Sequence, residues 1–219
     1  MYIVTGGAGF IGSAMIWKLN QMGIDDILVV DNLASTDKWK NLVNLRYTDY
    51  LHRDRFLKMV AGEGDPFGVK GIVHMGACSS TTEKDADFLM ENNTRYTQVL
   101  CRFALSHGAR FLNASSAATY GGGEHGFKDD HAGLHMLKPL NMYGYSKHLF
   151  DLWAQRAGVL DQIASIKFFN VFGPNAVSPS ISASQAVSSP NNTIRTIHFF
   201  FNIVQIILRL TGLATKASW

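Results

Sequence analysis

Gly6-Gly7-Ala8-Gly9-Phe10-Ile11-Gly12 is the stretch that decides the fold. It follows the short apolar run Tyr2–Thr5 and precedes an amphipathic segment, so a strand, a glycine turn and a helix are expected in succession. The first, fourth and seventh residues, Gly6, Gly9 and Gly12, form a Gly-x-x-Gly-x-x-Gly pattern. Such glycines let the backbone turn tightly and approach a pyrophosphate at the helix N-terminus. We therefore expect a dinucleotide to bind here.

The same alternation of strand and helix continues outward along the chain. Short β-branched apolar runs alternate with longer amphipathic stretches over the first 170 residues, which predicts an α/β fold with a Rossmann-type, doubly wound parallel sheet. The expected strands are Tyr2–Thr5, Asp26–Asp31, Gly71–His74, Ala109–Ala114 and Ala164–Phe169. The expected helices are Phe10–Met22, a segment near Asp54–Ala61, Asp85–His107 and Asn141–Ala157. The glycine- and histidine-rich stretch Gly121–Leu137 is expected to be an active-site loop.

Composition excludes several classes of protein. The 219 residues are 47% hydrophobic and 17% charged, which suits a packed core rather than a disordered chain. The net charge of +3 comes without a cluster of Lys and Arg, so no nucleic-acid partner is expected. Cys78 and Cys101 form no Cys-x-x-Cys pair, which favours a reduced, cytoplasmic protein. His125, His131 and His135 lack the further ligands of a metal site, so no metal is expected.

One acidic residue and two basic residues follow the glycine turn in the sequence. Asp31 closes the second expected strand, where a carboxylate can accept a hydrogen bond from a ribose 2′-hydroxyl and favour NAD. Lys38 and Arg53 come next and are suited equally to neutralising the 2′-phosphate of NADP and to being ordinary surface charges. The residues alone leave NAD and NADP open.

A tyrosine and a lysine provide the candidate catalytic chemistry. Tyr143 and Lys147 are four residues apart on an expected helix and so share one face. The lysine cation is expected to lower the pKa of the tyrosine and prepare it for proton transfer. Ser116 lies in the serine-rich stretch Ala114–Gly121, at the carboxyl end of an expected strand, where ligands bind in open α/β sheets. A serine hydroxyl there is placed to bond the substrate oxygen that the tyrosine deprotonates.

Together these motifs resemble the extended short-chain dehydrogenase/reductase family of nucleotide-sugar-modifying enzymes, from Met1 to about Pro174. Three segments, Val30–Leu33, His74–Glu83 and Asn170–Pro174, are similar to the branch that epimerises C6 of ADP-heptose for the lipopolysaccharide core. The residues Ser116-Ala117-Ala118 stand where dehydratases of the family have Thr-Asp-Glu, which argues against dehydration.

The resemblance implies an isomerase that transiently oxidises a nucleotide sugar, with NADP as cofactor and NAD as the alternative. It implies Tyr143 as base, Lys147 as its partner, Ser116 as hydrogen-bonding companion and Asn170 as a substrate contact. With the glycines of the turn, the expected cofactor contacts are Gly6, Gly9, Phe10, Ile11, Gly12, Asp31, Asn32, Lys38, Arg53, Met75, Gly76, Ala77, Cys78, Ser79, Asn92, Lys147 and Val171. The resemblance also implies a homo-oligomer for the intact family. Two other functions stay open: a different reductase or dehydrogenase of the family, and an inactive dinucleotide-binding fragment.

The composition changes abruptly after Pro174. All 17 acidic residues precede residue 176, and a serine-rich stretch replaces the family's His-Lys-Gly segment, whose lysine is a second catalytic group. We therefore expect a dinucleotide-binding domain at 1–174, a missing C-terminal substrate domain, and an out-of-frame or disordered tail at 175–219. The apolar run at 197–213 is short for a membrane span and is interrupted by Asn202, Gln205 and Arg209, so no membrane anchor is expected.

Overall fold

The computed structural model describes residues 1–62 and 66–171. The predicted tail at 175–219, with its apolar run at 197–213, lies outside the described residues. In the described ranges, no helix has both the length and the apolar character that crossing a membrane requires.

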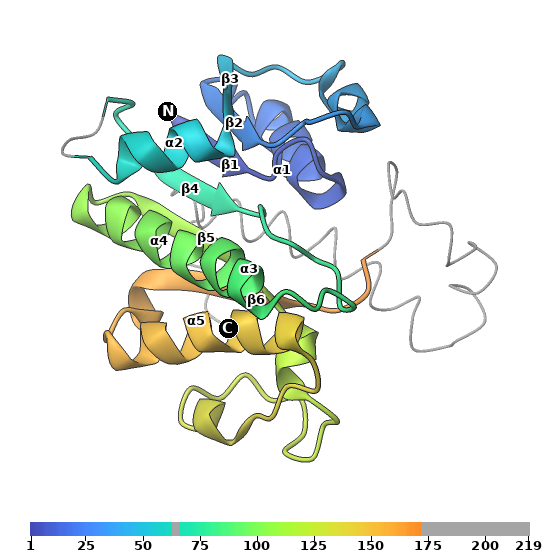
Figure 1. Ribbon diagram of the computed structural model, residues 1–219. Coiled ribbons are helices and arrows are strands. Elements are labelled where there is room, and N and C mark those ends of the chain that lie inside the picture. Colours follow the sequence, from blue (N-terminus) through green and yellow to red (C-terminus); the bar gives the residue numbers. More distant parts are fainter. Residues whose placement is uncertain (63–65, 172–219) are drawn as a thin grey trace.

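Six parallel strands make one sheet in the order β3-β2-β1-β4-β5-β6, which confirms the predicted Rossmann-type α/β fold (Figure 1). The strands are β1 (Tyr2–Thr5), β2 (Ile27–Asp31), β3 (Asp49–His52), β4 (Gly71–His74), β5 (Arg110–Ser116) and β6 (Ile163–Phe168). The chain steps outward from β1 to β3 and then crosses back to β4, which pairs with β1 on its other side. Ligands of such sheets bind at the carboxyl ends of the strands, where this change of direction leaves a crevice.

Strand β3 was not predicted from the sequence. It pairs with β2 at the edge of the sheet, and Leu51 alone of its four residues is buried. A short edge strand with one buried side chain has no clear alternation of apolar and polar residues, which is the pattern by which strands are recognised.

The helices agree with the predicted ones except in one segment. The α-helices are α1 (Phe10–Gln21), α2 (Arg53–Val60), α3 (Ala86–Leu89), α4 (Tyr96–Ser106) and α5 (Met142–Arg156). Short 3-10 helices are η1 (Asp37–Leu42), η3 (Ala117–Tyr120), η4 (Leu134–Met136) and η5 (Leu160–Gln162). The single helix predicted at Asp85–His107 is instead α3 and α4 joined by a π-helical turn, η2 (Met90–Arg95). A π turn leaves no periodicity signal of its own, and such turns are frequent at functional sites.

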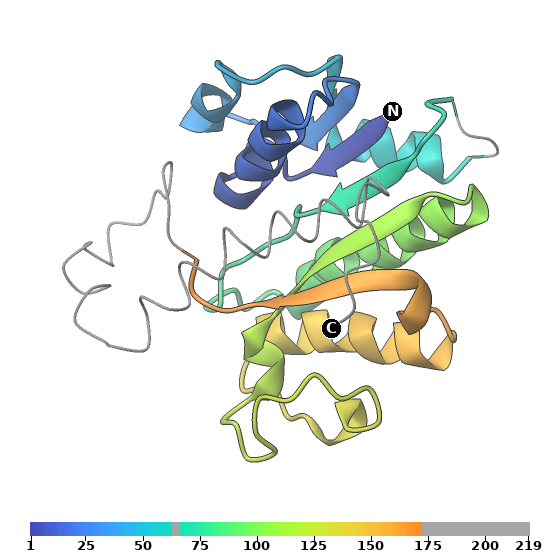
Figure 2. The ribbon, with the colours of Figure 1, turned by 180° about the vertical axis from the view of Figure 1, so that it is seen from behind.

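Each face of the sheet has its own core. Helices α2, α4 and α5 cover one face, where Phe56, Leu100 and Phe150 are buried against the strands (Figure 1). Helix α1 covers the opposite face, where Met15 and Ile16 are buried against β1 and β2 (Figure 2). All five residues of β2 are buried, as expected for a strand covered on both faces.

Buried His74 joins the end of β4 to its neighbours. The side chain is 1% exposed, its Nδ1 lies 2.6 Å from Thr5 Oγ1, and its Nε2 lies 2.8 Å from Thr97 Oγ1. These contacts give His74 a structural role at the end of β4. Burial, with a smaller contribution from the charge of Lys147, lowers the pKa of His74 from 6.5 to about 3. The imidazole stays neutral in the folded chain over the whole physiological range.

We expect this histidine to make the fold acid-sensitive. Below pH 6.5 the unfolded chain binds a proton at His74 and the folded chain does not, so stability is lost as the pH falls from 6.5 towards 3. The loss at pH 5 should be about 2 kcal/mol in the free energy of unfolding. Urea unfolding of the wild type and of His74→Gln at pH 7 and pH 5 measures it. The variant should lack this part of the pH dependence, while His125→Gln, an exposed-loop control, should keep it. An equal pH dependence in wild type and His74→Gln would contradict the assignment.

Candidate active site

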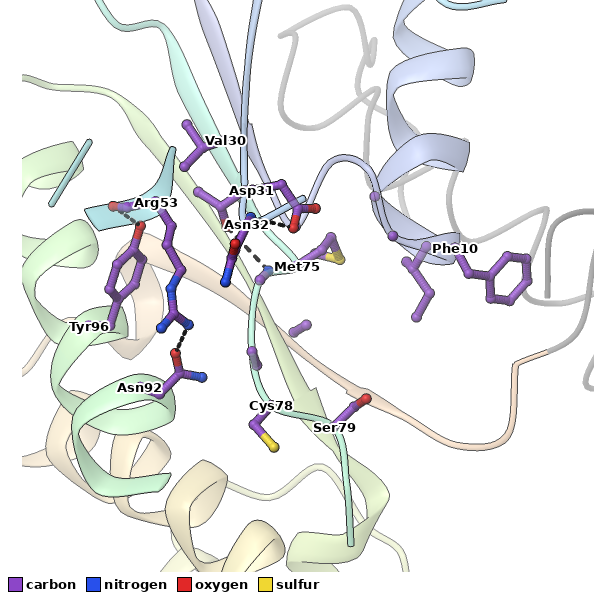
Figure 3. Close-up of a pocket in the computed structure, with 18 of the residues that line it drawn as sticks. Phe10, Val30, Asp31, Asn32, Arg53, Met75, Cys78, Ser79, Asn92 and Tyr96 are labelled. Carbon is purple, nitrogen blue, oxygen red and sulfur yellow. Dashed lines mark hydrogen bonds between the residues drawn. The ribbon is translucent and has the colours of Figure 1, made fainter. Parts of the chain in front are cut away.

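A cavity of about 630 Å³ lies at the carboxyl ends of the strands, on both sides of the switch between β1 and β4 (Figure 3). Its walls come from the glycine turn, the loop after β4, the π turn η2 and helix α5. The lining residues are Thr5, Gly6, Gly9, Phe10, Ile11, Gly12, Val30, Asp31, Asn32, Lys38, Arg53, Met75, Gly76, Ala77, Cys78, Ser79, Phe88, Asn92, Tyr96, Ala114, Ser115, Tyr143, Lys147 and Phe168.

The glycine turn is shaped for close contact with a ligand. A Cβ at Gly12 would lie 2.0 Å from the carbonyl oxygen of Gly6, so only glycine fits where α1 meets the turn. Gly6 has a φ of +64°, and a Cβ there would lie 2.6 Å from the amide nitrogen of Gly76. The first turn of α1 contains no acidic residue. Its free backbone N–H groups and the helix dipole therefore favour an anion, which fits the pyrophosphate of a dinucleotide.

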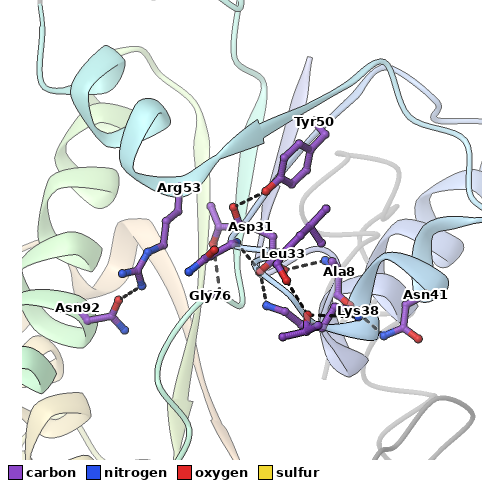
Figure 4. Close-up of polar contacts among 12 residues, drawn as sticks. Ala8, Asp31, Leu33, Lys38, Asn41, Tyr50, Arg53, Gly76 and Asn92 are labelled. Carbon is purple, nitrogen blue, oxygen red and sulfur yellow. Dashed lines mark hydrogen bonds and ion pairs between the residues drawn. The ribbon is translucent and has the colours of Figure 1, made fainter.

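Asp31, at the end of β2, is held by three donors (Figure 4). Its carboxylate accepts from Ala8 N at 2.9 Å, from Asn32 N at 2.7 Å and from Lys38 Nζ at 2.6 Å. The Asp31 side chain is buried, and the Lys38 ammonium covers it from the solvent side. The carboxylate charge is thus paired within the protein before any ligand arrives.

Arg53 faces the same end of the cavity from the first residue of α2 (Figure 4). Its Nη1 donates to Asn92 Oδ1 on the π turn, and its backbone carbonyl accepts from the Tyr96 hydroxyl at 3.3 Å. The Arg53 Nε lies 3.3 Å from Asp54 Oδ1. The guanidinium is therefore oriented by neighbours while it lines the cavity, which suits the recognition of a phosphate.

Tyr143 and Lys147 both line the cavity from α5, but their electrostatics differ from the sequence prediction. The Lys147 ammonium donates to the carbonyl oxygen of Ala114 at 2.7 Å. Burial raises the pKa of Tyr143, a hydrogen bond with Ser116 opposes the rise, and Lys147 is not among the causes of the shift. The predicted lowering of the tyrosine pKa is therefore wrong for the protein without ligand. Helical spacing places the two residues on one face, but burial of the hydroxyl sets the direction of the shift.

Two local features of α5 bring it against the serine segment. Asn141 caps the helix, its Oδ1 accepting from Gly144 N at 2.8 Å. A Cβ at Gly144 would lie 2.8 Å from the carbonyl oxygen of Ala118, so glycine permits the close approach to η3. This contact places Tyr143 beside Ser116. Gly144 was not predicted from the sequence, because a glycine within a helix carries no local sign of the segment that it approaches.

The π turn clamps the loop after β4 to the same helix. Asn93 is fully buried, and its side chain exchanges hydrogen bonds with the backbone N–H and C=O of Cys78 at 2.9 and 3.0 Å. The same amide donates to Ser146 Oγ at 3.1 Å, and Thr94 Oγ1 donates to the Ser146 carbonyl at 2.7 Å. Asn93 was also missed from the sequence, since no motif distinguishes it from its neighbour Asn92.

Most of the predicted site residues meet at the cavity, although the roles assigned to them stay predictions. All of the predicted cofactor contacts except Val171 line it. Ser116 neighbours Tyr143 but is not among the lining residues, and neither are Asn170 and Val171. Residues of the lining that the sequence analysis did not name are Thr5, Val30, Phe88, Tyr96, Ala114, Ser115 and Phe168. In the described part of the chain, no cluster of three His, Cys, Asp or Glu side chains is arranged to hold a metal ion.

Comparison with known proteins places this architecture in a family. The model of the NAD dependent epimerase/dehydratase family matches residues 2–195. The chain belongs to this family. A curated relative in this comparison, the ADP-L-glycero-D-manno-heptose-6-epimerase of Nitratidesulfovibrio vulgaris strain DP4, is 70% identical over 175 residues, which are 80% of the chain and 54% of the relative. This epimerase/dehydratase chain thus spans about half the length of the curated relatives that it matches.

Solved structures agree with this family assignment. The ADP-L-glycero-D-manno-heptose-6-epimerase of Helicobacter pylori aligns with a TM-score of 0.65 at 25% identity, over 80% of this chain and 55% of that one. A dTDP-glucose 4,6-dehydratase of Streptomyces venezuelae, solved with NAD bound, aligns with a TM-score of 0.64 at 29% identity, over 80% of this chain and 57% of that one. The shared part is the sheet and its helices, which confirms the fold and the family resemblance drawn from the motifs.

Proposed function

We propose that this chain carries the cofactor-binding and proton-transfer part of an epimerase that interconverts ADP-D-glycero-D-manno-heptose and ADP-L-glycero-D-manno-heptose. The observation that carries the proposal is the placement of Tyr143, beside Ser116, at a cavity of a chain 70% identical to a heptose 6-epimerase. The product would supply heptose for the lipopolysaccharide core.

The cavity fits a nicotinamide dinucleotide, which when bound supplies reversible hydride transfer at the sugar carbon. The turn from Gly6 to Gly12 and the first turn of α1 would hold the pyrophosphate of a bound dinucleotide. Of the residues that line the cavity, Asp31, Lys38 and Arg53 would hold the adenosine ribose. Lys147 and the loop Met75–Ser79 would hold the nicotinamide end.

The residues of α5 and η3 would handle the proton. Tyr143 removes the hydroxyl proton as the C6 carbon is oxidised and returns a proton when the ketone, having turned over in the site, is reduced from its opposite face. Ser116 bonds the same substrate oxygen, and the Lys147 cation stabilises the phenolate. In the chain without ligand, burial raises the pKa of Tyr143.

The Ser116-Ala117-Ala118 sequence favours epimerisation over dehydration. An elimination needs an additional acid and base beside the tyrosine, and the two alanines of η3 supply neither. The similarity of the fold to that of a dehydratase therefore does not imply a dehydration reaction.

A sugar labelled with deuterium at C6 tests the function. We expect the full chain, given NADP and this ADP-D-glycero-D-manno-heptose, to form the L-glycero isomer with the label still on the sugar and no net change in NADPH. Proton NMR of the sugar and absorbance at the nicotinamide band follow both. Label accumulating in NADPH would identify a dehydrogenase instead. An unchanged sugar in the presence of bound NADP would identify an inactive dinucleotide-binding fragment. This is the main alternative, because the chain spans only about half the length of its relatives.

We further propose NADP as the preferred cofactor. The Lys38 ammonium pairs with Asp31, which removes the negative charge that would repel a 2′-phosphate. Lys38 and Arg53 both line the cavity, and Figure 4 shows them on either side of Asp31. NAD, whose 2′-hydroxyl would need a free Asp31 carboxylate, is the weaker fit.

Removing both cations should reverse this preference. We expect Lys38→Ala combined with Arg53→Ala to lower the ratio of NADP to NAD affinity by roughly 100-fold, because each charged hydrogen bond to the phosphate is lost and Asp31 is freed for the hydroxyl. Calorimetric titration with each dinucleotide measures the ratio. Lys40→Ala is the control, since Lys40 pairs with Asp37 away from the cavity and should leave the ratio unchanged. An unchanged ratio in the double variant would refute the assignment of NADP.

Several predictions drawn from the sequence stay proposals. These are the division into a dinucleotide-binding domain at 1–174 and a separate tail at 175–219, the substrate contact at Asn170, a cytoplasmic location and a homo-oligomer. Gel filtration with light scattering measures the last of these directly.

A further inference from the structure

A cluster of three charges, two of them buried, lies behind the cavity. Lys147 is 3% exposed and Asp151 is 2% exposed, and they stand one turn apart on the same side of α5. The third charge is Lys167 on β6, whose ammonium donates to Asp151 Oδ2 at 2.8 Å. The cluster therefore contains two ammonium groups and one carboxylate, and Asp151 is their common counter-charge.

Asp151 also connects α5 to the strands that carry the serine segment. Its Oδ2 accepts from Ser115 Oγ on β5 at 2.8 Å, and its Oδ1 accepts from Ser165 Oγ on β6 at 2.9 Å. Lys167 in turn donates to Thr119 Oγ1 at 2.7 Å, and Thr119 donates to the carbonyl of Ser116 at 2.7 Å. Through these bonds one carboxylate holds both sides of the segment that presents Ser116.

Lys147 needs this carboxylate for a specific reason. Its ammonium donates to a neutral partner, the Ala114 carbonyl, although the group is buried. A buried ammonium without a nearby negative charge tends to lose its proton. An uncharged Lys147 would no longer stabilise the phenolate of Tyr143.

We propose that Asp151 is a positioning residue that keeps Lys147 charged and fixes the Ser115–Ser116 strand end against α5. Its importance for turnover rests on the proposed epimerase function. Its effect on Lys147 does not, because the charge of Lys147 exists in the chain without substrate or cofactor.

The electrostatic surroundings of Lys147 give the sign of the effect. Burial lowers the pKa of Lys147 to about 8, and Asp151, followed by Cys78, opposes the decrease. The other titratable groups around the cluster are Tyr143 on α5, His74 on β4 and Lys167 on β6. Neighbouring His148, whose pKa burial lowers, is also affected by Asp151 and Lys167. Asp151 is thus the main group in favour of the charged lysine.

Carbon-13 NMR of the full chain, labelled at lysine Cε and titrated from pH 6 to pH 10, tests the proposal without any ligand. The Lys147 resonance is assigned by its loss in Lys147→Arg. We expect Asp151→Asn to lower the Lys147 midpoint by about one pH unit, because its counter-charge is removed. Lys167→Met should raise the Lys147 midpoint, because it removes the other positive charge that shares the Asp151 carboxylate. Ser165→Ala removes a hydrogen bond to the same carboxylate and no charge, so it should leave the midpoint near the wild-type value.

The direction of the shift separates positioning from a merely structural role. A variant that only loosened the packing would hydrate Lys147 and raise the midpoint towards the ordinary lysine value of about 10.4. An unchanged or raised midpoint in Asp151→Asn therefore overturns the proposal. If circular dichroism shows that Asp151→Asn does not fold, the test rests on Lys167→Met. An unchanged or lowered Lys147 midpoint in Lys167→Met then overturns the proposal. The titration needs no substrate or turnover, so its result can be interpreted even if the epimerase assay shows no activity.

Discussion

Tyr143→Phe is expected to lower the rate of C6 epimerisation by roughly 1,000-fold, while dinucleotide affinity stays within about two-fold of the wild type. The substitution removes only the hydroxyl beside Ser116, and that hydroxyl is the proposed path for the substrate proton. The ring remains to fill the wall of the cavity, so the cofactor site keeps its shape. The rate is measured by NMR with ADP-heptose, and the affinity by calorimetry.

Tyr145→Phe provides a matched control for this prediction. Tyr145 is on the same helix, two residues away, but it is 45% exposed and does not line the cavity. The same chemical change there should leave the rate unaltered. A Tyr143→Phe chain that still turns over at the wild-type rate would show that another group moves the proton.

Gly12→Ala is expected to weaken dinucleotide binding by roughly 100-fold or more. The added methyl would lie 2.0 Å from the Gly6 carbonyl oxygen, and backbone on both sides leaves it no flexible neighbour to displace. The turn must move away from α1, which separates the amides of the turn from the N-terminus of the helix. Titration with NADP measures the loss, and a melting curve shows whether the fold survives.

Gly23→Ala is the control for this prediction. It separates the effect of crowding by the Gly6 backbone from the effect of replacing any glycine in a turn. Gly23 has a positive φ of +76°, and a Cβ added there would meet no atom within 4 Å. Its replacement should cost about 1 kcal/mol of stability and leave NADP affinity unchanged. Equal losses of affinity in the two variants would mean that the close packing at Gly12 has no special role in binding.

Local patterns were sufficient to predict the sheet, the glycine turn and the helix with Tyr143 and Lys147. Strand and helix periodicity and turn chemistry are properties of neighbouring residues, so they can be recognised one segment at a time. Two elements were not predicted, because neither has a distinct local pattern. The edge strand β3 buries only Leu51, and the π turn η2 interrupts a helix whose periodicity otherwise continues.

The site was predictable as a set of residues but not as an arrangement. Family motifs named Asp31, Lys38 and Arg53, yet the pairing of Lys38 with Asp31 became known only from the structure. Gly144 and Asn93 were missed because each is defined by what it touches, the Ala118 carbonyl and the Cys78 backbone, across gaps of 26 and 15 residues respectively.

The amino-acid sequence by itself determined the fold class, the dinucleotide turn and the tyrosine and lysine on one helical face, since these follow from spacing along the chain. Only the tertiary structure decided the electrostatics. Helical spacing predicted a lowered pKa for Tyr143, whereas burial raises it. The charge of Lys147 depends on Asp151, which is shared with Lys167 from another strand. The reason is physical: burial and the distribution of charge depend on all groups that surround an atom, and most of these come from distant parts of the chain.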